Sequence, residues 1–152
     1  MQDLSLHILD ITENAVRADA KNISIEVFED TLREELIISI KDDGRGMNED
    51  MRKKALDPFF TTKDGKRIGL GLSLFAQAAQ DTGGTLKINS ELGQGTIIRA
   101  IFKLNSPDLK PVGDILETLA SLITAYPAIR FVYDYKKGDD KYHFDSCVDC
   151  KK

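Results

Sequence analysis

One apolar stretch that runs directly into an acidic, glycine-containing loop constrains the fold more than any other feature of the chain. The stretch is residues 36–40, Leu-Ile-Ile-Ser-Ile, and the loop is residues 42–47, Asp-Asp-Gly-Arg-Gly-Met. A short apolar run bounded by a turn signal is typical of a buried strand. The loop therefore stands at the end of a strand, where it is a plain turn, a calcium loop or part of a binding site.

The glycines of this loop argue against calcium. A calcium loop needs oxygen ligands at alternate positions, and Gly44 and Gly46 occupy them. A carboxylate such as that of Asp42 can accept a hydrogen bond from an exocyclic amino group like that of adenine, and glycines let a planar base approach the backbone. A plain surface turn also favours Asp and Gly, so both interpretations stay open.

The first helix carries a polar stripe beside its apolar one. Residues 3–19 are predicted to form an amphipathic helix, on which His7, Asp10, Asn14 and Arg17 follow at i, i+3, i+7 and i+10. An Asn oxygen and a carboxylate on one face suit Mg²⁺, which prefers hard oxygen ligands and keeps several waters. A solvated helix face is the alternative.

A third group of residues has the character of a phosphate site. Residues 57–63, Asp-Pro-Phe-Phe-Thr-Thr-Lys, precede residues 67–73, Arg-Ile-Gly-Leu-Gly-Leu-Ser, which lead into a predicted helix over 71–79. Glycines that free backbone amides at a helix start make an anion site. Between Met47 and Ile68 the sequence contains six Lys or Arg and four acids, and this local positive excess suits a lid over a polyphosphate. Alternatively, the glycines only turn the chain and the phenylalanines belong to the core.

Further strands are predicted near residues 23–27, where apolar and polar residues alternate, and near 85–90 and 96–104, and a short helix with an Asn cap over 48–56. Residues 105–111 contain two prolines and are predicted to be a linker between a domain of residues 1–104 and an extension of residues 112–152. Within the extension the pattern indicates a helix and then a hairpin.

The extension ends in Cys147-Val-Asp-Cys150, with His143 four residues earlier. Two thiolates at this spacing suit a metal, but a full site needs four ligands, so a dimer or a partner would complete it. A frayed terminus with two reduced thiols is the alternative.

The overall charge excludes some classes of partner. The formal net charge is −4, which argues against nonspecific binding to nucleic acid or to a membrane. No apolar run approaches the length of a membrane span, so a cytoplasmic protein is expected.

Taken together, the order of these segments resembles the successive motifs of the GHKL superfamily, which includes gyrase, the Hsp90 chaperone, histidine kinases and the MutL mismatch-repair protein. The resemblance covers roughly residues 1–104 and adds Gly83-Gly84 and residues 93–96, Gly-Gln-Gly-Thr. It implies an α/β sandwich with helices on one face of a mixed, mainly antiparallel sheet, and ATP with Mg²⁺ as ligands. The phenylalanine and second glycine motifs look most like those of histidine kinases, and residues 13–15 are closer to MutL.

The resemblance also implies a role for each matching residue. Asn14 corresponds to the Mg²⁺ ligand, and Asp42 to the carboxylate that reads the adenine amino group, with Thr96 as its helper across the sheet. Gly44 and Gly46 correspond to the glycines that admit the base. The phosphates are expected at residues 69–72, Gly-Leu-Gly-Leu (Gly69, Leu70, Gly71 and Leu72), with Lys63 and Arg67 as cations within reach.

Two residues depart from the family pattern. Asp10 stands where the family usually carries a catalytic Glu, so its role as a base requires an adjusted geometry. Arg67-Ile68 stand where histidine kinases usually have Gly-Thr.

The two histidines, His7 and His143, are not placed like a phosphoacceptor before the domain, so a free-standing module is expected. Three functions remain open: phosphate transfer to a partner protein, a slow ATPase switch that dimerises, and an ATP sensor without catalysis.

Overall fold

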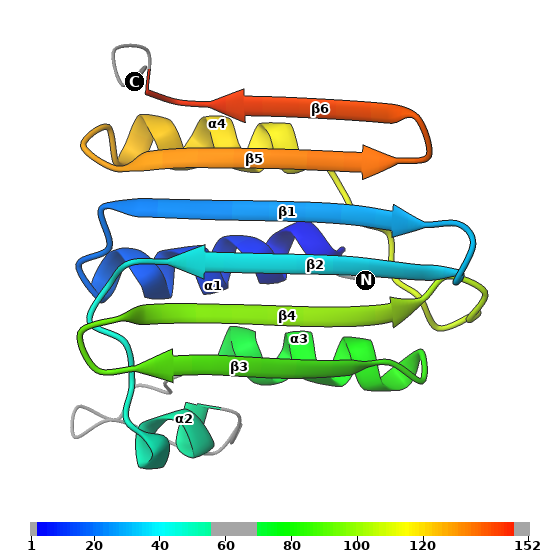
Figure 1. Ribbon diagram of the computed structural model, residues 1–152, viewed down its shortest axis with the longest axis horizontal. Coiled ribbons are helices and arrows are strands. Elements are labelled where there is room, and N and C mark those ends of the chain that lie inside the picture. The colour runs from blue at the N-terminus through cyan, green and yellow to red at the C-terminus, as the bar shows by residue number, and fades with distance from the viewer. Residues whose placement is uncertain (1–2, 56–69, 148–152) are drawn as a thin grey trace.

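The computed structural model describes residues 3–55 and 70–147, and it is a two-layer α/β sandwich (Figure 1). In chain order its elements are α1 (Leu4–Arg17), β1 (Asn22–Asp30), β2 (Glu35–Asp42), α2 (Glu49–Ala55), α3 (Leu70–Asp81), β3 (Thr85–Glu91), β4 (Gly95–Lys103), α4 (Ile115–Ala125), β5 (Arg130–Lys137) and β6 (Asp140–Asp145). Each of these elements overlaps a segment that the sequence pattern predicts.

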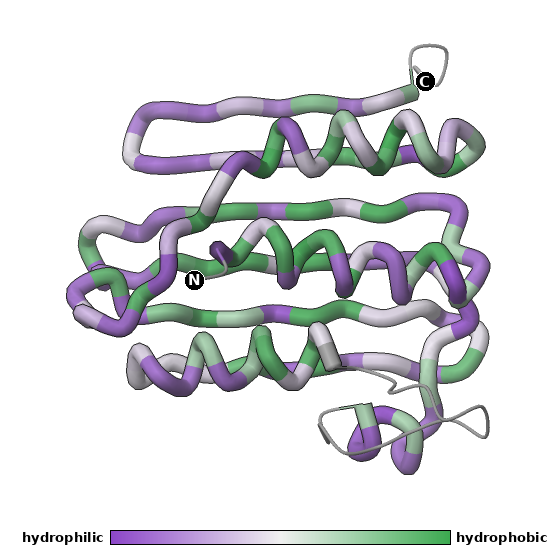
Figure 2. The backbone as a smooth tube through the Cα atoms, turned by 180° about the vertical axis from the view of Figure 1, so that it is seen from behind, coloured by the Kyte–Doolittle hydropathy of each residue, from purple (hydrophilic) through white to green (hydrophobic). Residues whose placement is uncertain are grey.

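The strands form one six-stranded sheet in the order β3-β4-β2-β1-β5-β6. Every pair is antiparallel except β1 with β5, which are parallel. Figure 2, from behind, shows α1, α3 and α4 across a single face of this sheet. The predicted fold class, a mixed and mainly antiparallel sheet with helices on one face, is confirmed.

The core lies between the helices and the inner face of the sheet. Alternate residues of the central strands point inward, as in β1, where Ile23, Ile25 and Val27 are buried. Phe75 of α3 and Phe102 of β4 are fully buried with ring centroids 5.5 Å apart. This packing sets the distance of α3 from the sheet.

Local hydrogen bonds fix where two of the helices begin. The Asn48 side chain accepts from the backbone N–H of Met51 at 2.8 Å, so the predicted Asn cap of α2 is confirmed. The Asp114 side chain likewise accepts from the N–H of Glu117 at 2.9 Å at the start of α4.

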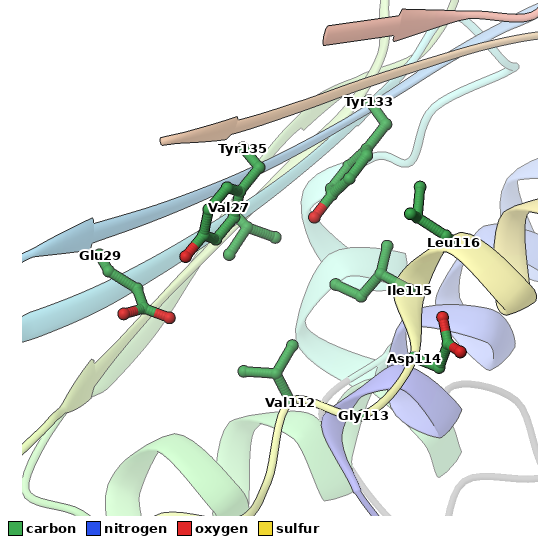
Figure 3. A pocket seen from close by; sticks show the side chains of 9 residues that line it. All are labelled: Val27, Glu29, Val112, Gly113, Asp114, Ile115, Leu116, Tyr133 and Tyr135. Atoms are coloured by element: carbon green, nitrogen blue, oxygen red, sulfur yellow. The ribbon is translucent and has the colours of Figure 1, made fainter. Parts of the chain in front are cut away.

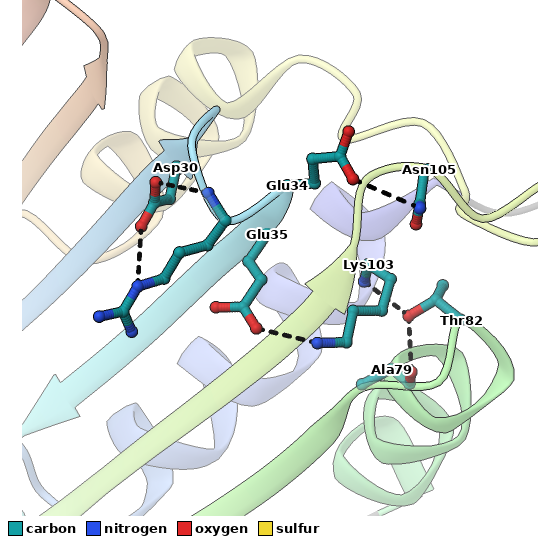
Figure 4. Close-up of polar contacts among 8 residues, drawn as sticks. Asp30, Glu34, Glu35, Ala79, Thr82, Lys103 and Asn105 are labelled. Carbon is teal, nitrogen blue, oxygen red and sulfur yellow. Dashed lines mark hydrogen bonds and ion pairs between the residues drawn. The ribbon is translucent and has the colours of Figure 1, made fainter.

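Polar contacts hold the sheet end at which β2 begins (Figure 4). Lys103 Nζ lies 2.9 Å from Glu35 Oε2, which joins β4 to β2. The Thr82 hydroxyl donates to the carbonyl of Ala79 at 2.8 Å and accepts from the N–H of Lys103 at 3.0 Å. The end of α3 is thereby tied to β4.

The C-terminal hairpin, β5 and β6, continues the same sheet, and α4 packs on it. β5 pairs with β1 from Asn22↔Arg130 to Glu29↔Lys137, and α4 covers these strands with Leu119 and Leu122 buried. The division of the chain at residues 104 and 111 stays a prediction. Among the described residues, no helix has the length and apolar character that a membrane span requires.

Truncating a buried leucine of α4 tests whether this helix is part of the common core. Leu119 is 2% exposed and Leu116 is 50% exposed. We expect Leu119→Ala to lower the free energy of unfolding by about 2–4 kcal/mol, and Leu116→Ala by roughly 0.5 kcal/mol or less. Chemical denaturation of both variants measures the difference. Equal losses would show that α4 is not packed as described.

Candidate functional site

Asp42 ends β2 with a buried side chain, 8% exposed. Its Oδ1 accepts from the backbone N–H of Gly44 at 2.8 Å. Burial raises the pKa of this carboxyl, and the hydrogen bond from Gly44 opposes the shift. A buried acid with a raised pKa at the end of a strand is the kind of group that binding sites use.

The glycines after Asp42 pack closely against backbone. A Cβ on Gly44 would lie 2.7 Å from the carbonyl oxygen of Ala18, at the end of α1. Gly46 has φ +73°, and a Cβ there would lie 2.0 Å from the carbonyl oxygen of Glu91. Both positions therefore require glycine for the fold, whether or not a base also contacts them.

Asp43, next to Asp42, has a structural role: its side chain bonds to the residues that precede and begin β1. Its Oδ1 accepts from the N–H groups of Lys21 and Asn22 at 2.7 and 2.9 Å. Although burial acts to raise its pKa, hydrogen bonds from the Asn22 side chain and from these backbone groups outweigh burial, and the pKa is lowered. Asp43 thus fixes the turn between α1 and β1.

Thr96 stands opposite Asp42 in the β2–β4 register, as its predicted role requires. Its hydroxyl lies 2.8 Å from the hydroxyl of Ser90, which also donates to the carbonyl of Gly95 and accepts from the N–H of Met47 at 2.8 Å. Ser90 therefore connects the 42–47 loop to the β3–β4 hairpin. Sequence reasoning missed Ser90; its pairing with Thr96 across the Gly-Gln-Gly turn is the signal that reveals it.

The polar stripe of α1 places Asp10 and Asn14 one turn apart on this helix, Asp10 exposed and Asn14 half-buried. The Asn14 amide oxygen accepts from Arg17 Nη1 at 2.8 Å. The Arg17 guanidinium is therefore bonded to the oxygen that the sequence predicts as a Mg²⁺ ligand. A metal ion at this oxygen would displace the guanidinium.

Asp10 lies against the start of α3. A Cβ on Gly71 would be 2.6 Å from the Cβ of Asp10 and 3.3 Å from its Oδ2. The carboxylate therefore stands beside the first turn of α3, where the positive end of the helix dipole favours negative charge. Leu72 follows as a core residue, 4% exposed, so its backbone alone is available to a ligand.

The remaining predicted residues cannot be placed to the same degree. Lys63, Arg67, Gly69 and Cys150 lie outside the described residues, and Leu70 is described only as the first residue of α3. Cys147 ends the described part. Among the described residues, no group of three or more His, Cys, Asp or Glu is arranged to hold a metal ion.

His7 differs from its expected place in the polar stripe. It is 2% exposed, and its ring centroid is 6.2 Å from that of Phe75, so it belongs to the α1–α3 packing. Its Nε2 is buried and makes no hydrogen bond with the part of the chain that the structure describes. Burial, followed by the charge of Lys110, lowers its pKa, against the opposing effects of Asp10 and Asp3.

The fold and this site define a class: a two-layer ATPase-type sandwich with an acid at the end of a central strand and polar groups along a facing helix. Residues 2–106 match the family of histidine kinase-, DNA gyrase B- and HSP90-like ATPases. The chain belongs to this family, which confirms the resemblance seen in its motifs.

Curated relatives are much longer proteins. A protein described as a sensor in Shewanella frigidimarina is 36% identical over 109 residues, which are 70% of this chain and 17% of the relative. Sporulation kinase C of Bacillus subtilis is 32% identical over 98 residues, 64% of this chain and 23% of the relative. The chain thus spans less than a quarter of the length of these relatives.

Solved structures share the fold. The MutL ATPase domain of Aquifex aeolicus, solved with ADP, superposes with a TM-score of 0.59 at 15% identity, over 89% of this chain and 60% of that one. The share of this chain is larger than residues 2–106, so the similarity extends into the segment that contains α4, β5 and β6.

The buried His7 predicts a pH-dependent stability. Because its pKa is lowered in the folded protein, the unfolded chain binds more protons once the pH falls below about 6.5, and stability is lost towards the lowered pKa. We expect His7→Leu to weaken this acid sensitivity. Thermal unfolding between pH 7.5 and 5 measures it; an identical pH profile for His7→Leu and the parent would contradict the assignment.

Proposed function

We propose that the chain binds Mg²⁺-ATP in front of α1 and transfers the γ-phosphoryl group to a partner protein. The observation that carries this proposal is the arrangement of Asp42, Asn14 and Asp10. Asp42 lies where the loop after β2 contacts the end of α1, and Asp10 lies beside the start of α3. From Asp10 to Ala18 the helix rises about 12 Å.

Adenine belongs at the Asp42 end. The Asp42 carboxylate accepts a hydrogen bond from the exocyclic amino group. Thr96, paired with Asp42, and Ser90 hold the end of the strand that carries Asp42. The phosphates belong at the start of α3, where the positive end of the helix dipole attracts anions. The name of the Aquifex MutL structure, a domain complexed with ADP, supports a nucleotide in this fold.

The residues present suit Mg²⁺ only together with a nucleotide. Asn14 offers one amide oxygen, and the described residues hold no acidic cluster that would bind the ion alone. Mg²⁺ is commonly bound through one or two side chains, waters and substrate phosphates. When bound, it would neutralise charge on the phosphates; Asn14 would orient it, and Arg17 would move off the amide oxygen.

Phosphoryl transfer is favoured over hydrolysis by the kinase names of curated relatives such as sporulation kinase C. A nucleophilic side chain of the partner attacks the γ-phosphorus, the bond to the bridging oxygen breaks, and ADP leaves. Asp10, beside the start of α3, would accept the proton that the nucleophile releases.

Removing the Asp42 carboxylate tests the adenine assignment. We expect Asp42→Ala to lower ATP affinity about thirtyfold, since an unsatisfied buried donor costs roughly 2 kcal/mol. The matched control is Asp43→Asn, whose side chain contacts only Lys21 and Asn22 within the described chain and should affect stability rather than affinity. Calorimetric titration of folded variants decides; parent-like affinity in Asp42→Ala would refute the assignment.

The role of Asn14 is tested by comparing nucleotide with and without metal. We expect Asn14→Ala to weaken Mg²⁺-ATP by about tenfold or more and to leave metal-free ATP nearly unchanged. Arg17→Gln should not reproduce this pattern, because it removes only the donor to the Asn14 oxygen. Equal losses with metal and with chelator would make Asn14 structural.

Asp10 is tested at saturating ATP. We expect Asp10→Asn to slow labelling of the partner by about 10²–10⁴-fold without changing ATP affinity. Asp81→Asn, at the far end of α3, is the control. Asp10→Glu should reduce transfer because the carboxylate already contacts the first turn of α3. Faster release of free phosphate from Asp10→Glu, with no labelled partner, would instead support a slow ATPase switch.

A further inference from the structure

A cavity of about 520 Å³ lies between the sheet and the segment that leads into α4 (Figure 3). Val27 and Glu29 of β1 and two tyrosines of β5 form one wall, and residues 112–116 form the other. Asp42 pairs with Ile23 of β1, six residues before Glu29. At about 3.3 Å per residue the cavity is therefore about 20 Å along the strand from the proposed adenine position.

Tyr133 places its hydroxyl in this cavity. The side chain is 6% exposed, and Figure 3 shows its hydroxyl directed into the space in front of Ile115. It makes no hydrogen bond with another described residue. Burial raises its pKa to about 12, so the hydroxyl is neutral and both donates and accepts. The oxygen is not among the buried side-chain atoms that lack a partner, so it opens into the cavity and can bond to a polar group there.

The polar lining of the cavity is acidic. Its charged side chains are Glu29 and Asp114, and neither Lys nor Arg is among the lining residues. Asp114 is engaged as the cap of α4, whereas Glu29, 22% exposed, has Lys137 as its ion-pair partner at 3.4 Å. Lys137 is 51% exposed, and an ion pair open to water contributes little. Glu29 therefore remains available to a second cation.

The rest of the lining is apolar. Val27, Val112, Ile115 and Leu116 face the tyrosine rings, and the N–H of Ser5 donates to the carbonyl of Val112 at 2.8 Å, which ties this wall to α1. The volume lies within the usual range for small-molecule sites, roughly 300–1,000 Å³. The cavity thus combines an apolar body with one anionic and hydroxyl-lined end.

We propose that this cavity binds a small organic amine. Its ammonium group would lie between Glu29 and the hydroxyls of Tyr133 and Tyr135, and its apolar part would lie against Val27, Val112 and Ile115. The tyrosine rings add a favourable face for a cation. This site is independent of the proposed nucleotide site and does not need it to be correct.

The test is calorimetric titration of the nucleotide-free protein with three probes of similar shape: 2-phenylethylamine, 2-phenylethanol and 3-phenylpropionate. We expect saturable one-to-one binding of the amine, at least about tenfold weaker binding of the alcohol, and no saturation with the carboxylate. No saturation with any probe up to its solubility, or equal affinity for amine and alcohol, would overturn the proposal.

Variants locate the binding. Glu29→Gln should weaken the amine about tenfold and leave the alcohol unchanged, and Tyr133→Phe should weaken both. Lys137→Gln should strengthen amine binding by freeing Glu29. Glu26→Gln makes the same charge change on β1 but at an exposed position outside the cavity, and it should have no effect. Equal effects of Glu29→Gln and Glu26→Gln, or displacement of the amine by ATP, would also overturn it.

Discussion

The close backbone packing around the end of β2 is the constraint on which the rest of the site depends. The N–H of Arg45 donates to the carbonyl of Ala18 at 2.8 Å, and the N–H of Gly93 donates to the carbonyl of Arg45 at 2.7 Å. The loop is therefore held between α1 and the β3–β4 hairpin with no room for side chains at Gly44 or Gly46. Asp42 keeps its place without ordering at the moment of binding, which lowers the entropic cost of recognising a ligand.

Local patterns in the sequence predict most of the fold. The apolar spacing over residues 3–19 corresponds to α1 at Leu4–Arg17, and Asn48 caps α2 as expected. What local patterns do not predict is the parallel pairing of β1 with β5. That contact joins residues more than a hundred positions apart, and nothing in either strand alone specifies its partner.

The site is predicted less completely than the fold. Helical spacing and the family motifs predicted Asp10, Asn14 and Asp42 as site residues. The structure has Asp42 at the end of β2, Asp10 beside the start of α3 and Asn14 bonded to Arg17, and their roles toward a ligand stay predictions. Spacing alone also grouped His7 with them, although the His7 side chain is buried in the core and packs on Phe75. Ser90 was missed because its importance comes from three contacts across the hairpin turn, which depend on strand register rather than on a motif.

The central claim is that Asp42 recognises the amino group of adenine, and the parent protein tests it most directly by comparison of ATP with ITP. ITP carries a carbonyl oxygen in place of that amino group and a proton on the neighbouring N1, and it has the same sugar and phosphates. At C6 the carboxylate then meets an oxygen lone pair instead of an N–H donor, so ITP should bind about thirtyfold more weakly than ATP at equal Mg²⁺. Equal affinity for the two nucleotides would contradict the account.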